Sequence, residues 1–146
     1  HIQACLATDL PMIVHARDAD EDIVKIIHEE TNGKGMRGVM HCFSSGPALA
    51  EEALELGFHI SFSGILTFKK SEELRAIAKK VPLERLLVET DSPFLAPEPH
   101  RGAMNTPAYV PLTGKVLADI HGLSAEEMAA HTTRNFYDLF NKAHLT

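Results

Sequence analysis

The sequence predicts an α/β fold with about four parallel strands, flanking helices and C-terminal helices. Two observations lead to this prediction: short apolar runs recur roughly every two to three dozen residues, and helical patterns fill the intervals between them. A third observation is that three runs end in or near side chains that can bind a metal ion, which are His15, His41 and Asp91. Because the carboxyl ends of parallel strands converge on one mouth, we expect these side chains to meet there.

Four extended runs and the helical patterns around them define the elements. Between the runs, apolar residues recur at the spacing of one helical face. The strands are predicted over 12–14, 37–41, 58–62 and 86–88. The helical patterns lie within 1–10, 23–31, 44–56, 71–80, 107–120 and 124–140.

Start and stop signals fit these bounds. Ser44 and Ser45 are N-cap candidates for a helix that Gly57 ends. Ser124 and Glu127 match a capping box at the start of the last helix. In that helix the side chains expected to be buried are Met128, Phe136, Leu139 and Phe140.

After Asp91 the chain becomes rich in turn-forming residues. This composition indicates an ordered irregular loop, and long loops at strand ends often carry function. The residues concerned are Pro93, Pro97, Pro99, Gly102 and Pro107.

Composition limits the class of protein. With 146 residues, 45% of them hydrophobic, the chain can form one domain with a sizeable core. No apolar run approaches the roughly 18 residues of a membrane span, so no membrane contact is expected. The net charge of -6 excludes a broad basic surface that coats nucleic acid, but it does not exclude a nuclease. Cys5 and Cys42 form no CxxC pattern, and a cytoplasmic location is expected.

The positions of the histidines favour a metal site. Of nine histidines, only His15 and His41 end a β-run. Residues two apart in a strand share a face, so Arg17 is expected beside His15, and Glu89 beside Asp91. An inward Glu89 needs a cation or a hydrogen-bond donor, for which Arg17 or a histidine is the natural partner. A purely structural ion pair between Glu89 and Arg17 is the alternative.

Two further positions are candidates for contact with a phosphate. Ser44 and the residues after it could present free backbone N–H groups at a helix start, although ordinary capping is the simpler interpretation. Arg101, with its neighbour His100, could help hold a phosphodiester, or the two could be a solvated surface pair. Cys42 is interpreted as a packing residue rather than a nucleophile, because no activating base is evident.

At this point the sequence resembles the TatD-type metal-dependent deoxyribonucleases, a branch of the amidohydrolase-like TIM barrels. The resemblance extends over essentially the whole chain. It implies that the four strands are the last four of a (β/α)8 barrel. Residues 1–146 are then expected to form a single partial domain, the C-terminal half of the barrel. The N-terminal half, with its own metal ligands, is not part of this sequence. The blocks that carry it are PMIVHARD at 11–18, HCFS at 41–44, SFSG at 61–64, ETDSPFLAP at 89–97 and RGAMNTPAYV at 101–110.

The resemblance implies hydrolysis of DNA phosphodiester bonds by a metal-activated water. His15, His41 and Asp91 fall on the family's ligand positions for one or two divalent ions, with Mg, Mn and Zn not distinguished. Asp91 is also the candidate catalytic base. Four residues are expected to orient the ligands or face the phosphate, namely Arg17, Glu89, Ser44 and Arg101.

Three alternatives stay open from the residues themselves. The same ligands suit an amidohydrolase or lactonase that acts on small molecules. Two histidines and a carboxylate also suit the iron site of an oxygenase. Finally, a half-barrel could be a catalytically silent scaffold, whose open edges must be covered by the missing half or by self-association.

Overall fold

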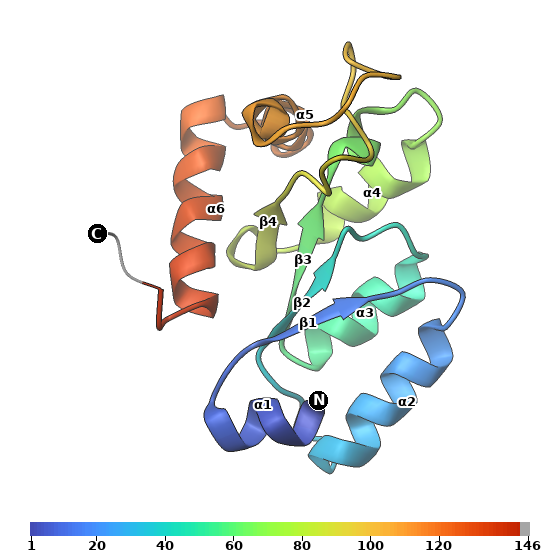
Figure 1. Cartoon of the computed structure of the whole chain (residues 1–146), viewed down its shortest axis with the longest axis vertical. Helices are drawn as coiled ribbons and strands as arrows, with labels where there is room; N and C mark the ends of the chain where they lie inside the picture. Colours follow the sequence, from blue (N-terminus) through green and yellow to red (C-terminus); the bar gives the residue numbers. More distant parts are fainter. Residues whose placement is uncertain (144–146) are drawn as a thin grey trace.

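The computed structural model describes residues 1–143 as an alternation of helices and strands (Figure 1). The strands are β1 (Met12–His15), β2 (Gly38–His41), β3 (Phe58–Phe62) and β4 (Leu86–Val88). The α-helices are α1 (Ile2–Thr8), α2 (Asp20–Thr31), α3 (Pro47–Glu55), α4 (Glu72–Lys80), α5 (Val110–His121) and α6 (Ala125–Leu139). Short 3₁₀ helices are η1 (Gly64–Thr67), η2 (Leu83–Arg85) and η3 (Pro107–Tyr109). Within the described residues, none of the helices has the length and apolar character that crossing a membrane requires.

The strands follow one another in the sheet in their order along the chain, and each neighbouring pair is parallel. The prediction of an α/β fold with four parallel strands is therefore confirmed. Helices α2, α3 and α4 lie along one side of the sheet, whereas α6 stands beside β4 (Figure 1). The register places His15 directly opposite His41, so β1 and β2 end at the same level.

Alternation along the strands gives the sheet two faces of different composition. On one face, Phe58, Ile60 and Phe62 of β3 are fully buried in the main hydrophobic core. Burial of each such side chain contributes roughly 1.5–3 kcal/mol, so this face holds the helices onto the sheet. The other face carries the residues in between, which are Ile13, His15, Val39, His41, His59, Ser61 and Leu87.

The end of α6 covers part of this second face. Leu139 packs in a small buried cluster with Val39 and Leu87. Arg37 ties the same region together, because its guanidinium donates to the carbonyl of Leu139 at 3.2 Å and to Oδ1 of Asp9 at 2.8 Å. The remainder of the face is open, with Ile13 at 62% exposure.

Of the two predictions about helix starts, the one for α6 is confirmed and the one for α3 is wrong. The capping box of α6 is confirmed, since Oγ of Ser124 accepts the N–H of Glu127 and the Glu127 carboxylate accepts the N–H of Ser124. The prediction that Ser44 or Ser45 caps α3 is wrong, because Gly46 holds the N-cap position. Pro47 explains the shift, since its fixed φ and missing N–H suit the first helical residue.

The expectation that Phe136 is buried is wrong, because its exposure is 42%. Successive residues of a helix point about 100° apart, so Phe136 is turned away from the neighbouring Asn135, which faces inward. Asn135 is buried because its side-chain amide donates to the carbonyls of Leu83 and Leu86. The buried stripe of α6 is thus partly polar, and consists of Met128, Thr132, Asn135 and Leu139.

The loops that follow β3 and β4 pack on each other. The N–H of Glu98 donates to the hydroxyl of Thr67 at 2.9 Å. A side chain at Gly64 would collide with the carbonyl oxygen of Leu95, so only glycine permits this approach of the two backbones. The proline-rich segment after Asp91 is therefore an ordered loop fixed to its neighbour, as the sequence predicted.

Candidate metal centre

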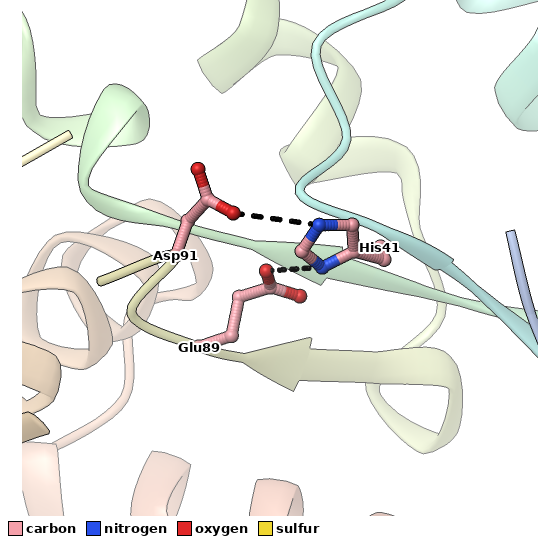
Figure 2. A group of neighbouring side chains, drawn as sticks. All are labelled: His41, Glu89 and Asp91. Atoms are coloured by element: carbon pink, nitrogen blue, oxygen red, sulfur yellow. Dashed lines mark ion pairs between the residues drawn. The ribbon is translucent and has the colours of Figure 1, made fainter. Parts of the chain in front are cut away.

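The mouth of the sheet brings together three side chains that offer metal-ligand atoms within 4.8 Å of one another, those of His41, Glu89 and Asp91 (Figure 2). His41 is the last residue of β2. Glu89 comes directly after β4, and its N–H donates to the carbonyl of Phe62 at 3.0 Å, which continues the pairing with β3. The parallel register thus places residues far apart in sequence around one point, and their ligand atoms could hold a metal ion.

Glu89 uses both carboxylate oxygens at the end of β2, which β3 separates from β4 in the sheet. Oε1 lies 2.6 Å from Nδ1 of His41, and Oε2 accepts the backbone N–H of Cys42 at 3.1 Å. Of the two partners predicted for Glu89, Arg17 or a histidine, the structure shows the histidine. A carboxylate at Nδ1 fixes the tautomer and orientation of the ring, which leaves the lone pair on Nε2.

Nε2 of His41 faces Oδ1 of Asp91 at 3.4 Å (Figure 2). When Nδ1 carries the proton, both atoms of this contact are hydrogen-bond acceptors, and they repel each other unless a cation or a proton lies between them. Two ligand atoms that each lie about 2.1 Å from one tetrahedral zinc ion are roughly 3.4 Å apart. His41 and Asp91 therefore fit a divalent ion.

The backbone at this mouth is left-handed at several residues that are not glycine. Cys42 has φ 47° directly after β2, Asp91 has φ 59° in the turn after β4, and Asp18 has φ 52° after β1. Each such residue costs of order 1–3 kcal/mol and persists only where its surroundings fix it. The hydrogen bond from Cys42 to Glu89 is one of these fixing contacts.

His15, the other predicted ligand, lies beside the group without joining it. Its ring centroid is 5.9 Å from that of His41, and its side chain is exposed. In the described residues, β1 pairs only with β2, so no strand covers its other edge. The role of His15 as a metal ligand stays a prediction.

The site opens onto a cleft of about 1150 Å³. Two residues predicted to face a phosphate, Arg17 and Ser44, line this cleft. The alternative ion pair between Arg17 and Glu89 is absent from the described part of the chain, where Glu89 pairs with His41. Further residues line the cleft that the sequence patterns did not indicate. The acidic ones are Asp18, Asp20, Glu21 and Asp22, and the apolar ones include Ile65, Phe94 and Leu95.

Cys42 is not a nucleophile at neutral pH. Burial raises the pKa of its thiol to about 11, and the negative charges of Asp91 and Glu89 act in the same direction. Its Sγ lies 3.2 Å from the hydroxyl of Ser63. The thiol therefore stays neutral, in agreement with its interpretation as a packing residue.

Comparison with known sequences decides the family. The family model described as TatD related DNase matches residues 1–141. The chain belongs to the TatD-related DNase family. The resemblance predicted from the strand-end motifs is thus confirmed.

Curated relatives are similar in sequence to this chain but are longer. The chain is 50% identical over 141 residues to the Escherichia coli (strain K12) protein named uncharacterized metal-dependent hydrolase YcfH. Identity is 42% over 132 residues to YabD of Bacillus subtilis and 39% over 135 residues to TatD of Mycobacterium tuberculosis, which carry the same description. The alignments cover 97%, 90% and 92% of this chain, and 53%, 51% and 50% of the relatives. The chain therefore spans about half the length of these relatives.

The chain also spans about half the length of two similar proteins of known structure. The TatD homologue YjjV of Escherichia coli K12 superimposes with a TM-score of 0.86 at 29% identity, and the match covers 96% of this chain and 53% of that protein. A TatD-family hydrolase of Entamoeba histolytica gives a TM-score of 0.83 at 20% identity and shows the same fold, over 97% of this chain and 55% of the other. The prediction that the four-stranded fold is half of a TatD barrel is confirmed.

Arg101, the remaining predicted phosphate contact, lies outside the cleft of this TatD-family chain. Its guanidinium stacks over the ring of Phe68, 3.6 Å from the centroid, on the loop after β3. Arg101 is nevertheless an exposed residue, so its charge is open to solvent. Arg101 can therefore contact only a substrate that extends beyond the cleft.

Asn105 has a structural role at the site that the sequence patterns did not indicate. Only 4% of its surface is exposed, and its side-chain amide donates to the carbonyls of Thr90 and Phe94 at 2.7 Å each. These carbonyls lie on either side of Asp91, so one buried amide holds the turn that carries the carboxylate. Periodicity gives no signal for such a residue. Its place in the family block at 101–110 was the only indication.

Proposed function

We propose that the complete protein is a metal-dependent hydrolase that cleaves phosphodiester bonds of DNA. The observation that carries the proposal is the approach of His41 Nε2 and Asp91 Oδ1 at 3.4 Å, with the ring of His41 fixed by Glu89. A divalent ion bound there supplies an activated water and polarises a phosphoryl oxygen. The names of the relatives support hydrolysis, and the description of the family supports DNA as the substrate.

Each residue of the mouth has a separate task in this proposal. His41 and Asp91 hold the ion, and His15 joins them from the adjacent strand. Asp91 also takes the proton of the attacking water, since Glu89, the other carboxylate of the three-residue group, is engaged with His41 and Cys42. Glu89 is a positioning residue rather than a ligand, because His41 and Cys42 already occupy its two oxygens.

Arg17 favours a phosphate-containing substrate over an amide or a lactone, in a cleft that is also lined by the acidic residues Asp18, Asp20, Glu21 and Asp22. The guanidinium of Arg17 lines the cleft without a carboxylate partner among the ion pairs of residues 1–143. A guanidinium matches the geometry of a phosphate and can bind two of its oxygens. Ser44 lines the same cleft, close in sequence to the start of α3, and its hydroxyl can add a further hydrogen bond. A neutral amide would not need these groups.

The test uses a complete barrel, made by joining this chain to the half of Escherichia coli YcfH that it does not match. The protein is stripped of metal, reloaded with Mg, Mn or Zn, and incubated with end-labelled DNA and with small amides and lactones. Metal-dependent release of nucleotides is the expected result. Turnover of amides or lactones without cleavage of DNA would contradict the proposed substrate, and cleavage of DNA in the presence of a chelator would contradict the proposed chemistry.

Three variants complete the test. Asp91→Asn and His41→Asn are expected to abolish cleavage, because each removes a ligand. Glu51→Gln removes one negative charge from an exposed position of α3 and is the matched control, expected to cleave as the unchanged protein does.

A further inference from the structure

We infer that Phe94 forms a stacking platform for the DNA base next to the cleaved phosphate. This inference rests on the proposed function and deepens it, because it names the part of the substrate that the cleft recognises. Phe94 lines the cleft, and 69% of its surface is exposed. The described residues leave most of this side chain uncovered, so packing among them does not account for an aromatic residue at this position.

The exposed ring stands on a fixed backbone. The N–H of Phe94 donates to the carbonyl of Asp91 at 2.9 Å, which closes the turn that begins at the metal ligand. The carbonyl of Phe94 accepts the buried amide of Asn105 at 2.7 Å. The next residue, Leu95, is held against Gly64 of the neighbouring loop. The backbone that carries the ring is therefore fixed relative to Asp91 before any substrate binds.

A nucleobase is the group that this arrangement fits. Every base has a flat apolar face, and stacking on an aromatic side chain is tolerant of sequence. Ile65 and Leu95 border the same cleft and extend the apolar surface around the ring. The charged residues of the cleft, apart from Asp91, come from the segment after β1 and the start of α2, and they are Arg17, Asp18, Asp20, Glu21 and Asp22. The cleft thus offers Arg17 and the proposed metal ligands to the phosphate, and an apolar surface to the base.

The stacked base is expected at the end of a strand. Inside a continuous stack, both faces of a base are already covered by its neighbours, so an internal base must be pulled out before it can contact Phe94. A terminal base has one free face and needs no such step. The inference therefore predicts that contact with Phe94 depends on a base at one end of the substrate.

The experiment measures binding, so that it does not depend on catalytic activity. The complete barrel described above, loaded with Mn, is titrated into a labelled phosphorothioate oligonucleotide that resists cleavage, and fluorescence anisotropy gives Kd. Two further oligonucleotides lack the terminal base at the 5′ or the 3′ end. Phe94→Ala, Phe94→Tyr and Met104→Ala are compared. Met104 is the matched control, because it is 79% exposed on the same loop but does not line the cleft.

Phe94→Ala is expected to weaken binding of the intact oligonucleotide by about tenfold to a hundredfold. Removal of the terminal base at one of the two ends should weaken binding to the unchanged protein by the same factor. The same removal should not weaken binding to Phe94→Ala any further. Phe94→Tyr should restore affinity, and Met104→Ala should not change it. Equal affinity of Phe94→Ala and the unchanged protein for the intact oligonucleotide would overturn the inference. If the Tm of Phe94→Ala also fell, Phe94 would be a packing residue of the assembled barrel.

The two proposals fail in different ways. Absence of DNA cleavage by the complete barrel overturns the proposed function, and the inference with it. Cleavage of DNA together with unchanged binding by Phe94→Ala overturns the inference alone.

Discussion

The carboxylate of Glu89 lies 2.6 Å from Nδ1 of His41. The residues that follow each of these two side chains in the sequence make further contacts with the same pair. On one side, the second oxygen of Glu89 holds the left-handed Cys42. On the other, Asp91 reaches Nε2 of the same ring. The contact thus orients the imidazole of His41 and shapes the mouth of the sheet at the same time.

Glu89→Gln is expected to lower metal affinity by about tenfold to a hundredfold, as loss of an outer-shell partner of a ligating histidine does. A glutamine side chain can offer an oxygen to Nδ1 of His41 or to the N–H of Cys42, but not to both. Titration calorimetry with Mn in the complete barrel measures the change. Glu51→Gln serves as the control, and a Glu89→Gln protein that binds Mn as tightly as this control would refute the positioning role.

Gly64→Ala is expected to damage the site from a distance. A Cβ at residue 64 would meet the carbonyl oxygen of Leu95, so the loop that carries Asp91 and Phe94 must move. Forced contacts of this kind typically cost roughly 1–3 kcal/mol of stability, and here they should also displace Asp91, the proposed metal ligand. Weaker Mn binding together with a lower Tm is the expected result. Gly114→Ala, at a helical glycine with open space around it, should raise stability slightly and leave Mn binding unchanged.

His59 is expected to make stability depend on pH. It is buried, and its Nδ1 has no hydrogen-bond partner within residues 1–143. Burial lowers the pKa of its imidazole, and the charge of Arg85 lowers it further. In the unfolded chain the group titrates near pH 6.5, roughly its ordinary value. The unfolded state therefore takes up a proton first, and the free energy of unfolding falls as pH drops below about 6.5 toward the lower pKa of the folded state.

Urea unfolding at a series of pH values between about 5 and 8 measures this effect. His59→Gln should flatten the dependence, whatever its effect on absolute stability. His131→Gln, which removes a partly exposed imidazole from α6, should leave the slope as it is. Identical slopes for all three proteins would show that His59 is not the group responsible.

The 146-residue chain by itself is expected to have little nuclease activity and to self-associate. In residues 1–143 the outer edges of β1 and β4 have no strand partner, and Ile13 and Leu10 are 62% and 46% exposed. Activity should be at least about a hundredfold below that of the complete barrel, because loss of a single outer-shell partner already costs about tenfold to a hundredfold. Light scattering after size-exclusion chromatography should show a mass that rises with concentration. A monomer that cleaves DNA as fast as the complete barrel would contradict both expectations.

Several structural features were predictable because they depend on neighbours in sequence. Strands and helices follow from local periodicity, and the capping box of Ser124 and Glu127 needs only four consecutive residues. Strand direction then placed His41 and Asp91 at one mouth, since parallel strands end at the same edge. The burial of Phe136 was predicted wrongly from the same kind of pattern. A helical stripe shows which residues share a face, but not whether a polar residue such as Asn135 will find carbonyls to bond inside the protein.

The sequence by itself determined the α/β alternation, the strand ends with His15, His41 and Asp91, and the family. Only the tertiary structure decided which of these groups touch. Glu89 bonds to His41 rather than Arg17 because the register of β2, β3 and β4 sets the distances across the mouth. The clamp of Asn105 on the Asp91 turn has the same origin. Such contacts join residues that the chain separates widely, and no local preference encodes the distance between them.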